Sequence, residues 1–522
     1  MLWRVVAVPA VPVRPPLAMR LIVALAGLTL LLHVVVNLVS PYGFHRDELL
    51  YLAMGRHLEL WRMDFPPLMA LVAEATRGLL GDSLVAIRFM PALAGAALVV
   101  MAALLAREFG GALFAQALAM LCVLAHPLFL RAANLFQPVV LDQLWWTLGF
   151  LALARLGRDA APRWWLLLGV AGGLGLLTKF SILFFGLAVM MALLATPLRR
   201  ALAGPWPWVA AGIALAIGHP SIVGQIALDW PLRLQMAGLR EAQLERVTWA
   251  EFLGTQFLFG PATLAVALVG LAALVSGPGW RAYRAVGWAA LGSFLILLVL
   301  RGKPYYAGPV YPAVCAAGAV VIAGLPWPRA STMLRWASVT LVVLYGGVLT
   351  LPLGLPVLPP PVMARYAERL GVTAAVQTNR GERLELPQDY ADMLGWDAQV
   401  VALARVYRSL PPAEREEAVI IARNYGEAGA IDFLGRRHGL PGAISPAGTY
   451  WQFGPGEKPG AVAVTIGVDR ADLLEYYDSV VTVGRVDEPW VVPEERDVQI
   501  NVARRPRETL QAVWGRVGPH YR

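Results

Sequence analysis

Long apolar stretches, separated by short polar connections, fill the chain up to about residue 353. A helix needs roughly 20 apolar residues to cross a bilayer. The windows of that length are 21–39, 84–106, 111–131, 137–156, 164–178, 181–198, 207–226, 253–276, 285–300, 308–325 and 335–353. The pattern therefore predicts about eleven transmembrane helices.

Basic residues gather in alternate connections between these windows. They are Arg107, Arg155, Arg158, Arg163, Arg199, Arg200, Arg281, Arg284, Arg329 and Arg335. The positive-inside rule then places the N-terminus in the cytoplasm. An odd number of spans places everything after residue 353 on the outer side, as expected of a multi-pass protein of the bacterial inner membrane.

The first outer loop, 40–82, is unusually long. Apolar residues recur at helical spacing in 47–61 and again in 67–80, on either side of a proline-containing turn. We expect two amphipathic helices that lie on the membrane surface.

The composition changes after the proline-rich segment 351–361. A helical pattern over 388–410 is followed by a strand at 418–422, a helix at 427–437, a strand at 461–466, a helix at 471–477 and a strand at 480–483. This alternation predicts a small α/β domain. The expected organisation is a membrane domain, 1–353, and an outer domain, 354–522.

Composition supports this fold class and excludes others. Of 522 residues, 58% are hydrophobic and only 15% are charged, which is not the composition of a water-soluble protein. Both cysteines, Cys122 and Cys315, lie in apolar segments, so no disulfide framework is indicated. The net charge of +9 comes from arginines at the ends of spans, so nucleic-acid binding is not indicated.

Polar residues of the membrane region concentrate on the outer side, where topology does not require them. Ionisable groups at membrane depth are costly and usually functional, so we expect a polar cavity that opens outward. The candidate residues are His45, Arg46, Asp47, Glu48, Asp64, Arg131, Gln137, Asp142, Lys179, Lys303, Tyr305 and Tyr306.

Lysines are rare in this chain, which has only Lys179, Lys303 and Lys458. Two of them lie at outer membrane boundaries, where a lipid phosphate would lie, and an ammonium group is a good partner for phosphate. The alternative is that both lysines merely extend to the interface. The turn-forming and hydroxyl-bearing neighbours of Lys303, among them Tyr305 and Tyr306, favour a phosphate site there.

Asp142 falls about one turn inside the fourth window. An unpaired carboxylate at that depth is not expected, so Asp142 either forms a network with Arg131 or faces the cavity.

A loop carboxylate beside cationic phosphate partners suggests transfer of a group from a lipid phosphate to a hydroxyl. Asp47 is the candidate base that takes the proton of the acceptor hydroxyl, while the cations stabilise the departing phosphate. Two other classes use similar residues: a transporter or flippase of a lipid-linked or anionic substrate, and a non-catalytic scaffold. The clustering of acids on one side, without an internal repeat, favours the enzyme.

The sequence His45-Arg46-Asp47-Glu48-Leu49-Leu50-Tyr51-Leu52-Ala53, followed by 64–68, resembles a known first outer loop. It is similar to the bacterial branch of the dolichyl-phosphate-mannose protein mannosyltransferases, which includes the lipid A aminoarabinose transferases. These are inverting GT-C glycosyltransferases whose donor is a polyprenyl-phosphate sugar.

The resemblance implies that Asp47 is the base with Glu48 as its neighbour, and that Asp142 is a second acid. It also implies that Lys303, with Tyr305 and Tyr306, contacts the donor phosphate. The acceptor stays open between a lipid, a glycan and a protein. Some relatives bind a divalent metal, but no ligand set is recognisable here, so neither a metal nor another cofactor is predicted.

Overall fold

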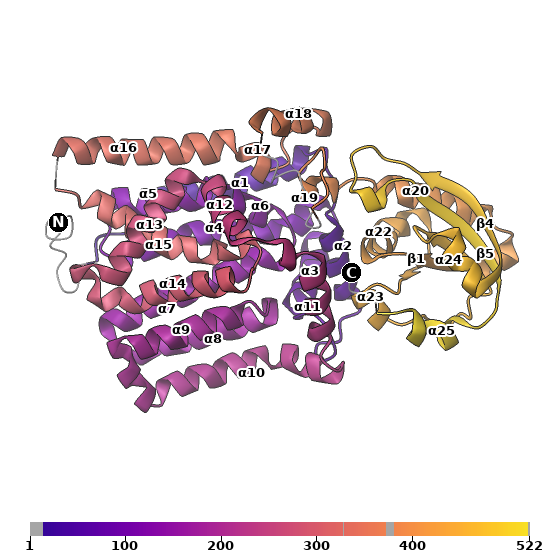
Figure 1. Ribbon diagram of the computed structural model, residues 1–522, viewed down its shortest axis with the longest axis horizontal. Helices are drawn as coiled ribbons and strands as arrows, with labels where there is room; N and C mark the ends of the chain where they lie inside the picture. The colour runs from indigo at the N-terminus through magenta and orange to yellow at the C-terminus, as the bar shows by residue number, and fades with distance from the viewer. Residues whose placement is uncertain (1–13, 327, 372–380, 520–522) are drawn as a thin grey trace.

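The computed structural model describes residues 14–326, 328–371 and 381–519. A bundle of long helices makes up most of the molecule, and a smaller domain that contains a sheet lies beyond one end of the bundle (Figure 1). The bundle helices are α1 (Met19–Val39), α4 (Leu84–Glu108), α5 (Leu113–Leu124), α6 (Pro127–Asn134), α7 (Pro138–Asp159), α8 (Pro162–Thr178), α9 (Ile182–Ala195), α10 (Trp206–Ala227), α12 (Trp249–Phe259), α13 (Pro261–Ser276), α14 (Arg284–Val299), α15 (Tyr311–Ala323) and α16 (Pro328–Leu344).

Each of the predicted apolar windows contains a helix. Within the described residues, seven helical segments are long and apolar enough to cross a membrane, or up to ten if each bent pair is one span. The bent pairs are α5 with α6, α12 with α13, and α9 with the 3-10 helix Pro197–Ala203. The remaining window holds α8, which has 17 residues. The bundle is thus that of a multi-pass membrane protein.

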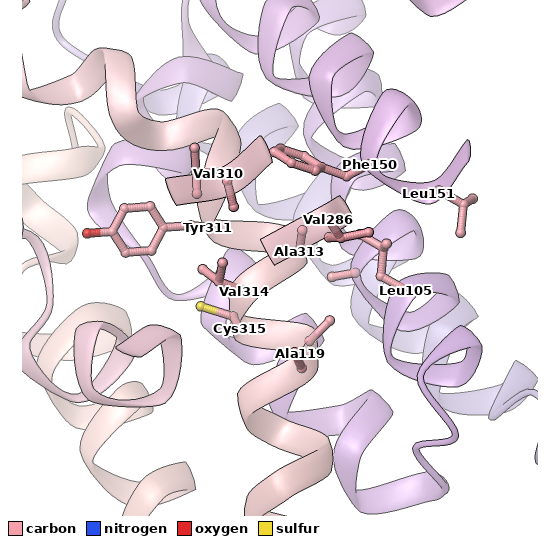
Figure 2. Packing of buried hydrophobic residues seen from close by; sticks show 14 of the residues in the cluster. Leu105, Ala119, Phe150, Leu151, Val286, Val310, Tyr311, Ala313, Val314 and Cys315 are labelled. Atoms are coloured by element: carbon pink, nitrogen blue, oxygen red, sulfur yellow. The ribbon is translucent and has the colours of Figure 1, made fainter. Parts of the chain in front are cut away.

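The centre of the bundle is α15, whose labelled residues Tyr311, Ala313 and Val314 lie among side chains of neighbouring helices (Figure 2). Glycines allow α13 to approach α15 closely. A Cβ added to Gly270 would collide with the carbonyl of Val314, and one added to Gly318 would collide with the carbonyl of Val266. Small residues at such crossings increase van der Waals contact, which is a main source of helix association in a bilayer.

At the end of α4, a buried carboxylate gathers the arginines that the sequence places on the cytoplasmic side. Glu108 is 1% exposed and pairs with Arg14 at 2.8 Å, Arg155 at 3.3 Å and Arg158 at 3.5 Å. A buried charge needs such partners to offset its lost hydration. These arginines therefore hold helices together, in addition to any role in topology.

Two helices of the first outer loop, α2 (Arg46–Arg56) and α3 (Leu68–Leu80), match the predicted amphipathic segments. The expected placement of α2 on the membrane surface is wrong. Leu49 and Ala53 of α2 belong to the core of the C-terminal domain, whereas Leu52 packs against Ile87 and Phe136 of the bundle. Both faces of α2 are therefore buried, because the C-terminal domain covers the side that would otherwise meet water.

The C-terminal domain contains a five-stranded sheet with strand order β2-β1-β3-β5-β4. Strands β1, β2 and β3 are parallel, and β5 is antiparallel to both β3 and β4. The sheet elements are β1 (Val419–Ala422), β2 (Ala443–Ile444), β3 (Val462–Ile466), β4 (Tyr477–Val486) and β5 (Val498–Pro506), with helices α20 (Trp396–Ser409), α21 (Pro412–Glu417), α22 (Tyr425–Leu434), α23 (Thr449–Gln452), α24 (Arg470–Tyr476) and α25 (Leu510–Val517).

Alternate residues of β3 pack into two different hydrophobic clusters, one on each face of the sheet. Val462, Val464 and Ile466 face a cluster that includes residues of α20, α22 and α2, while Ala463 faces residues of α24 and α25. The predicted α/β pattern is present, although β2, β5, α21, α23 and α25 were not predicted. Because α2 shares a hydrophobic core with the sheet, the C-terminal domain is docked on the first loop.

The segment between the bundle and the sheet forms α17 (Leu351–Gly354), α18 (Pro360–Leu370) and α19 (Gln388–Ala391). The single helix predicted over 388–410 is wrong, because the chain breaks at Gly395, where φ is +88°. Glycine accommodates this left-handed conformation without steric cost. The break separates α19, which lies against the first loop, from α20, which packs on the sheet (Figure 1).

Candidate functional site

Asp47 lies in the first turn of α2, at the end of the bundle that faces the C-terminal domain (Figure 1). Its Oδ2 accepts a hydrogen bond from Nε2 of Gln137 at 3.0 Å, and its Oδ1 accepts one from the hydroxyl of Tyr425 at 2.9 Å. The side chain of His45 caps the helix by accepting the backbone N–H of Asp47 at 3.1 Å. Asp47 is only partly buried, so its carboxylate is held in place yet remains accessible.

Glu48, the neighbour of Asp47, is in a different environment. It is fully buried and accepts two hydrogen bonds of 2.8 Å from Arg88, one to each carboxylate oxygen. The backbone N–H groups of His45 and Phe136 each donate to it at 2.7 Å. With four donors Glu48 is saturated, so in this structure it anchors the loop, and its place beside Asp47 in the chemistry stays a prediction.

A network of ionic contacts surrounds the side chain of His45, the residue that precedes α2. Nε2 of His45 lies 3.6 Å from Asp389 and 3.9 Å from Asp392, and Asp389 also forms an ion pair with Arg131. Arg131 therefore does not pair with Asp142, so the first of the two arrangements expected for Asp142 is wrong. Burial raises the pKa of Asp392, an effect that the nearby Arg46 and His45 oppose.

Arg46 points toward the C-terminal domain. Its guanidinium donates to Glu494 at 2.9 Å and lies 5.1 Å from the ring centroid of Tyr425. Burial would lower the pKa of Arg46, but Tyr425, Asp392, Glu495 and Glu494 together raise it well above its ordinary value. Arg46 thus stays cationic and holds the two domains together.

A narrow cleft reaches into the bundle beside Asp142, and Lys179, Ser181, Tyr305 and Tyr306 also line it. Asp142 accepts hydrogen bonds from Nε1 of Trp146 at 3.0 Å and from Oγ of Ser181 at 2.8 Å. It also interacts electrostatically with Lys179. The second arrangement expected for Asp142, in which it faces a cavity, is the one observed.

Lys179 lines this cleft, and Lys303 lies close enough to Lys179 to interact with it electrostatically. Nζ of Lys179 lies 4.3 Å from the ring centroid of Tyr306 and 5.6 Å from that of Tyr305. Burial lowers the pKa of Lys303, and the nearby cations Lys179 and Arg131 act in the same direction, while Tyr306 and Asp47 oppose them. This crowding of cations makes the corner suited to an anion such as a phosphate.

A second, more open cleft lies between the first loop and the C-terminal domain. Its lining residues include Arg56, His57, Arg62, Asp64, Thr449 and Phe453. Asp64 is 1% exposed and accepts hydrogen bonds from Thr449 at 2.8 Å and from Gln235 at 3.2 Å. Tyr51 lies close enough to both Asp64 and Asp47 to interact electrostatically with each.

No group of three or more His, Cys, Asp or Glu side chains that could hold a metal ion occurs among the described residues. The expectation on cofactors stays a prediction.

Several residues of the site escaped the sequence interpretation. Arg88 could have been identified, because a charged residue inside an apolar window usually matters for function or folding. Asp389, Asp392 and Tyr425 had no such signal, since acids and tyrosines in a segment of ordinary soluble composition do not stand out.

Comparison with known proteins adds to this geometry. Residues 64–223 match the model of the family described as dolichyl-phosphate-mannose-protein mannosyltransferase. No curated protein matches the chain in sequence.

The fold is similar to that of ArnT from Cupriavidus metallidurans in crystals with undecaprenyl phosphate. That comparison has a TM-score of 0.60 at 16% sequence identity and covers 93% of this chain and 97% of that one. The apo form of ArnT gives a TM-score of 0.58 with the same identity and coverage. The fold class predicted from the sequence, a GT-C type membrane bundle with a small C-terminal α/β domain, is confirmed.

Proposed function

Because this chain is of the protein mannosyltransferase/ArnT-like GT-C type, as its first loop predicted, we propose that it is a membrane glycosyltransferase that uses a polyprenyl-phosphate sugar. The observation that carries the proposal is Asp47. Its carboxylate is oriented by hydrogen bonds from Gln137 and Tyr425. It also lies close enough to Lys303 and Arg131 to interact electrostatically with both. A base beside an anion-binding corner is what sugar transfer from a lipid phosphate requires.

In the proposed reaction, Asp47 takes the proton of an acceptor hydroxyl as the hydroxyl oxygen attacks the anomeric carbon of the sugar. The bond between that carbon and the phosphate oxygen breaks, and the electron pair leaves with the polyprenyl phosphate. Attack opposite the leaving group inverts the anomeric configuration. The products are the glycosylated acceptor, the free polyprenyl phosphate and a proton on Asp47.

Lys303 and Lys179, with Tyr305, Tyr306 and Arg131, are the proposed partners of the donor phosphate. Lys179, Tyr305 and Tyr306 line the narrow cleft, and Lys303 and Arg131 interact electrostatically with residues there. The donor phosphate is a diester with a single negative charge, and its binding would offset the crowding of cations around Lys303. The crystal structure of ArnT bound to undecaprenyl phosphate supports a lipid phosphate as a ligand for a protein of this fold.

The more open cleft beside Asp64 is the proposed entry for the acceptor, because Asp64 lines it and Tyr51 interacts electrostatically with both Asp64 and Asp47. Its lining is polar and partly contributed by the C-terminal domain. The active site would then lie on the outer face of the bacterial inner membrane, with the N-terminus in the cytoplasm.

The test is release of free polyprenyl phosphate from a panel of polyprenyl-phosphate sugars by the purified protein with a membrane extract as acceptor source. We expect wild type to release it from one donor class, Asp47→Asn to release none, and Asp487→Asn, a change to an exposed loop acid, to behave as wild type. No release by folded wild type from any donor would overturn the proposal and favour transport of a lipid-linked substrate.

A further inference from the structure

The two hydrogen bonds to Asp47 come from different domains. Gln137, which precedes α7 in the bundle, donates to Oδ2, and Tyr425, the first residue of α22 in the C-terminal domain, donates to Oδ1. A carboxylate oxygen can accept more than one hydrogen bond. Both contacts therefore orient Asp47 and still leave it able to accept a further proton donor.

The hydroxyl of Tyr425 can reach Asp47 because α22 lies very close to α2. A Cβ added to Gly429 would lie 2.8 Å from Cβ of Leu49 and 3.0 Å from its carbonyl oxygen. The obstacle is backbone, which cannot move aside as a flexible side chain would. Any side chain at position 429 must therefore push α22 away from α2.

The ring of Tyr425 is fixed independently of this contact. Asn424 caps α22 by accepting the backbone N–H groups of Gly426 at 2.9 Å and Glu427 at 3.0 Å. The guanidinium of Arg46 lies over the ring of Tyr425. Burial, reinforced by the charge of Asp47, raises the pKa of Tyr425 well above its ordinary value, so its hydroxyl remains a donor at any physiological pH.

From this geometry we infer that the C-terminal domain completes the active site: Tyr425 is a positioning residue for the Asp47 carboxylate, and Gly429 sets the helix approach that brings it there. The inference rests on the proposed function for the role of Asp47 as base. It assigns the outer domain a part in the chemistry, because undocking α22 would release one oxygen of the base. A purely structural cap would leave Asp47 unaffected.

The first test is the carboxylate stretching band of Asp47 in infrared spectra, identified as the band missing from Asp47→Asn. Tyr425→Phe keeps the ring but removes the donor, so we expect this band to shift. Tyr407→Phe is the matched control, since the hydroxyl of Tyr407 bonds only to the carbonyl of Arg415 inside the domain among the contacts described. An unchanged band in Tyr425→Phe overturns the inference.

Turnover gives the second readout. A hydrogen bond to a charged group contributes roughly one to two powers of ten to an equilibrium or rate. We expect Tyr425→Phe to lower kcat by about tenfold or more with the donor KM unchanged, and Tyr407→Phe to change neither. Equal kcat in wild type and Tyr425→Phe would contradict a positioning role.

Gly429→Ala tests the helix approach without touching the tyrosine. We expect it to shift the Asp47 band as Tyr425→Phe does, while Gly515→Ala, in a helix with open space at that position, leaves the band unchanged. If the band shifts in these variants but wild type releases no polyprenyl phosphate from any donor, the proposed function is overturned and the positioning of Asp47 stands. An unshifted Asp47 band in folded Gly429→Ala would contradict the claim that Gly429 sets the approach of α22 to α2.

Discussion

Arg88 and Glu48 form a fully buried ion pair in which Nε and Nη2 of the guanidinium each donate to one carboxylate oxygen at 2.8 Å. The pair joins α4 to the start of α2, and Glu48 also accepts the backbone N–H of Phe136, which precedes α7. Three segments that surround Asp47 are thus tied together by one carboxylate. Glu48 therefore holds in place the backbone that carries Asp47, the candidate base.

Replacing Arg88 with methionine keeps the volume but leaves Glu48 as a buried, unpaired charge. Loss of one partner of a buried pair costs about 3–5 kcal/mol. We expect Arg88→Met to lower the thermal unfolding temperature in detergent markedly. Arg485→Met is the control, because Arg485 pairs with Asp497 on the exposed surface, where such a pair contributes at most about 1 kcal/mol. Equal losses in the two variants would contradict the anchoring role.

Lys303 offers a direct test of the phosphate corner. Replacing it with methionine removes the ammonium and keeps most of the aliphatic chain. We expect Lys303→Met to raise the donor KM by roughly tenfold to a hundredfold, the usual range for a hydrogen bond to a charged group.

The control is Lys458→Met, since Lys458 lies in the C-terminal domain and donates to the carbonyls of Glu416 and Ala418. Binding of radiolabelled donor would separate affinity from turnover. A donor KM that is unchanged in Lys303→Met would argue that this lysine only extends to the membrane interface.

Local patterns explain which parts of this architecture were predictable. Apolar windows and loop charges depend on the bilayer, so the membrane helices and the motif around Asp47 stand out in the sequence. The different roles of Asp47 and Glu48 do not stand out in the sequence. Arg88, which pairs with Glu48, lies 40 residues away, and Tyr425, which donates to Asp47, lies 378 residues away.

The wrong prediction that α2 lies on the membrane surface also arises from contacts between segments far apart in sequence. The amphipathic pattern of α2 implies one face exposed to solvent. In the structure, Leu49 and Ala53 are instead buried in the core of the C-terminal domain. Similarly, the helical pattern over 388–410 continues across Gly395, although the chain turns there. Tertiary contacts decide both cases.

The docking of the C-terminal domain should depend on pH through Glu427, which belongs to the capping box of α22. Burial, followed by the neighbouring Glu495, raises the pKa of Glu427 from 4.5 to about 8. The folded state therefore holds a proton that the unfolded chain loses near pH 4.5. Its contribution to stability is complete below that pH and is lost as the pH rises through about 8.

We expect the unfolding temperature of wild type to fall between pH 5 and 8 more steeply than that of Glu427→Gln, which cannot ionise. Glu475→Gln, at an exposed position of α24, should keep the wild-type slope. Thermal unfolding across this pH range measures the difference. Parallel slopes for wild type and Glu427→Gln would exclude Glu427 as the titrating group.

The crossing of α13 and α15 supplies the last prediction, because both helices meet through glycine. An alanine at Gly318 would place its methyl group against the carbonyl of Val266, and neither backbone can yield without moving a whole helix. Overpacking of this kind costs about 1–3 kcal/mol. Gly186→Ala in α9 is the matched change, since nothing lies within 4 Å of the added Cβ there. We expect Gly318→Ala to lower the unfolding temperature in detergent and Gly186→Ala to leave it unchanged. The same shift in both would mean that helix propensity, and not the close approach of α13 to α15, governs these positions.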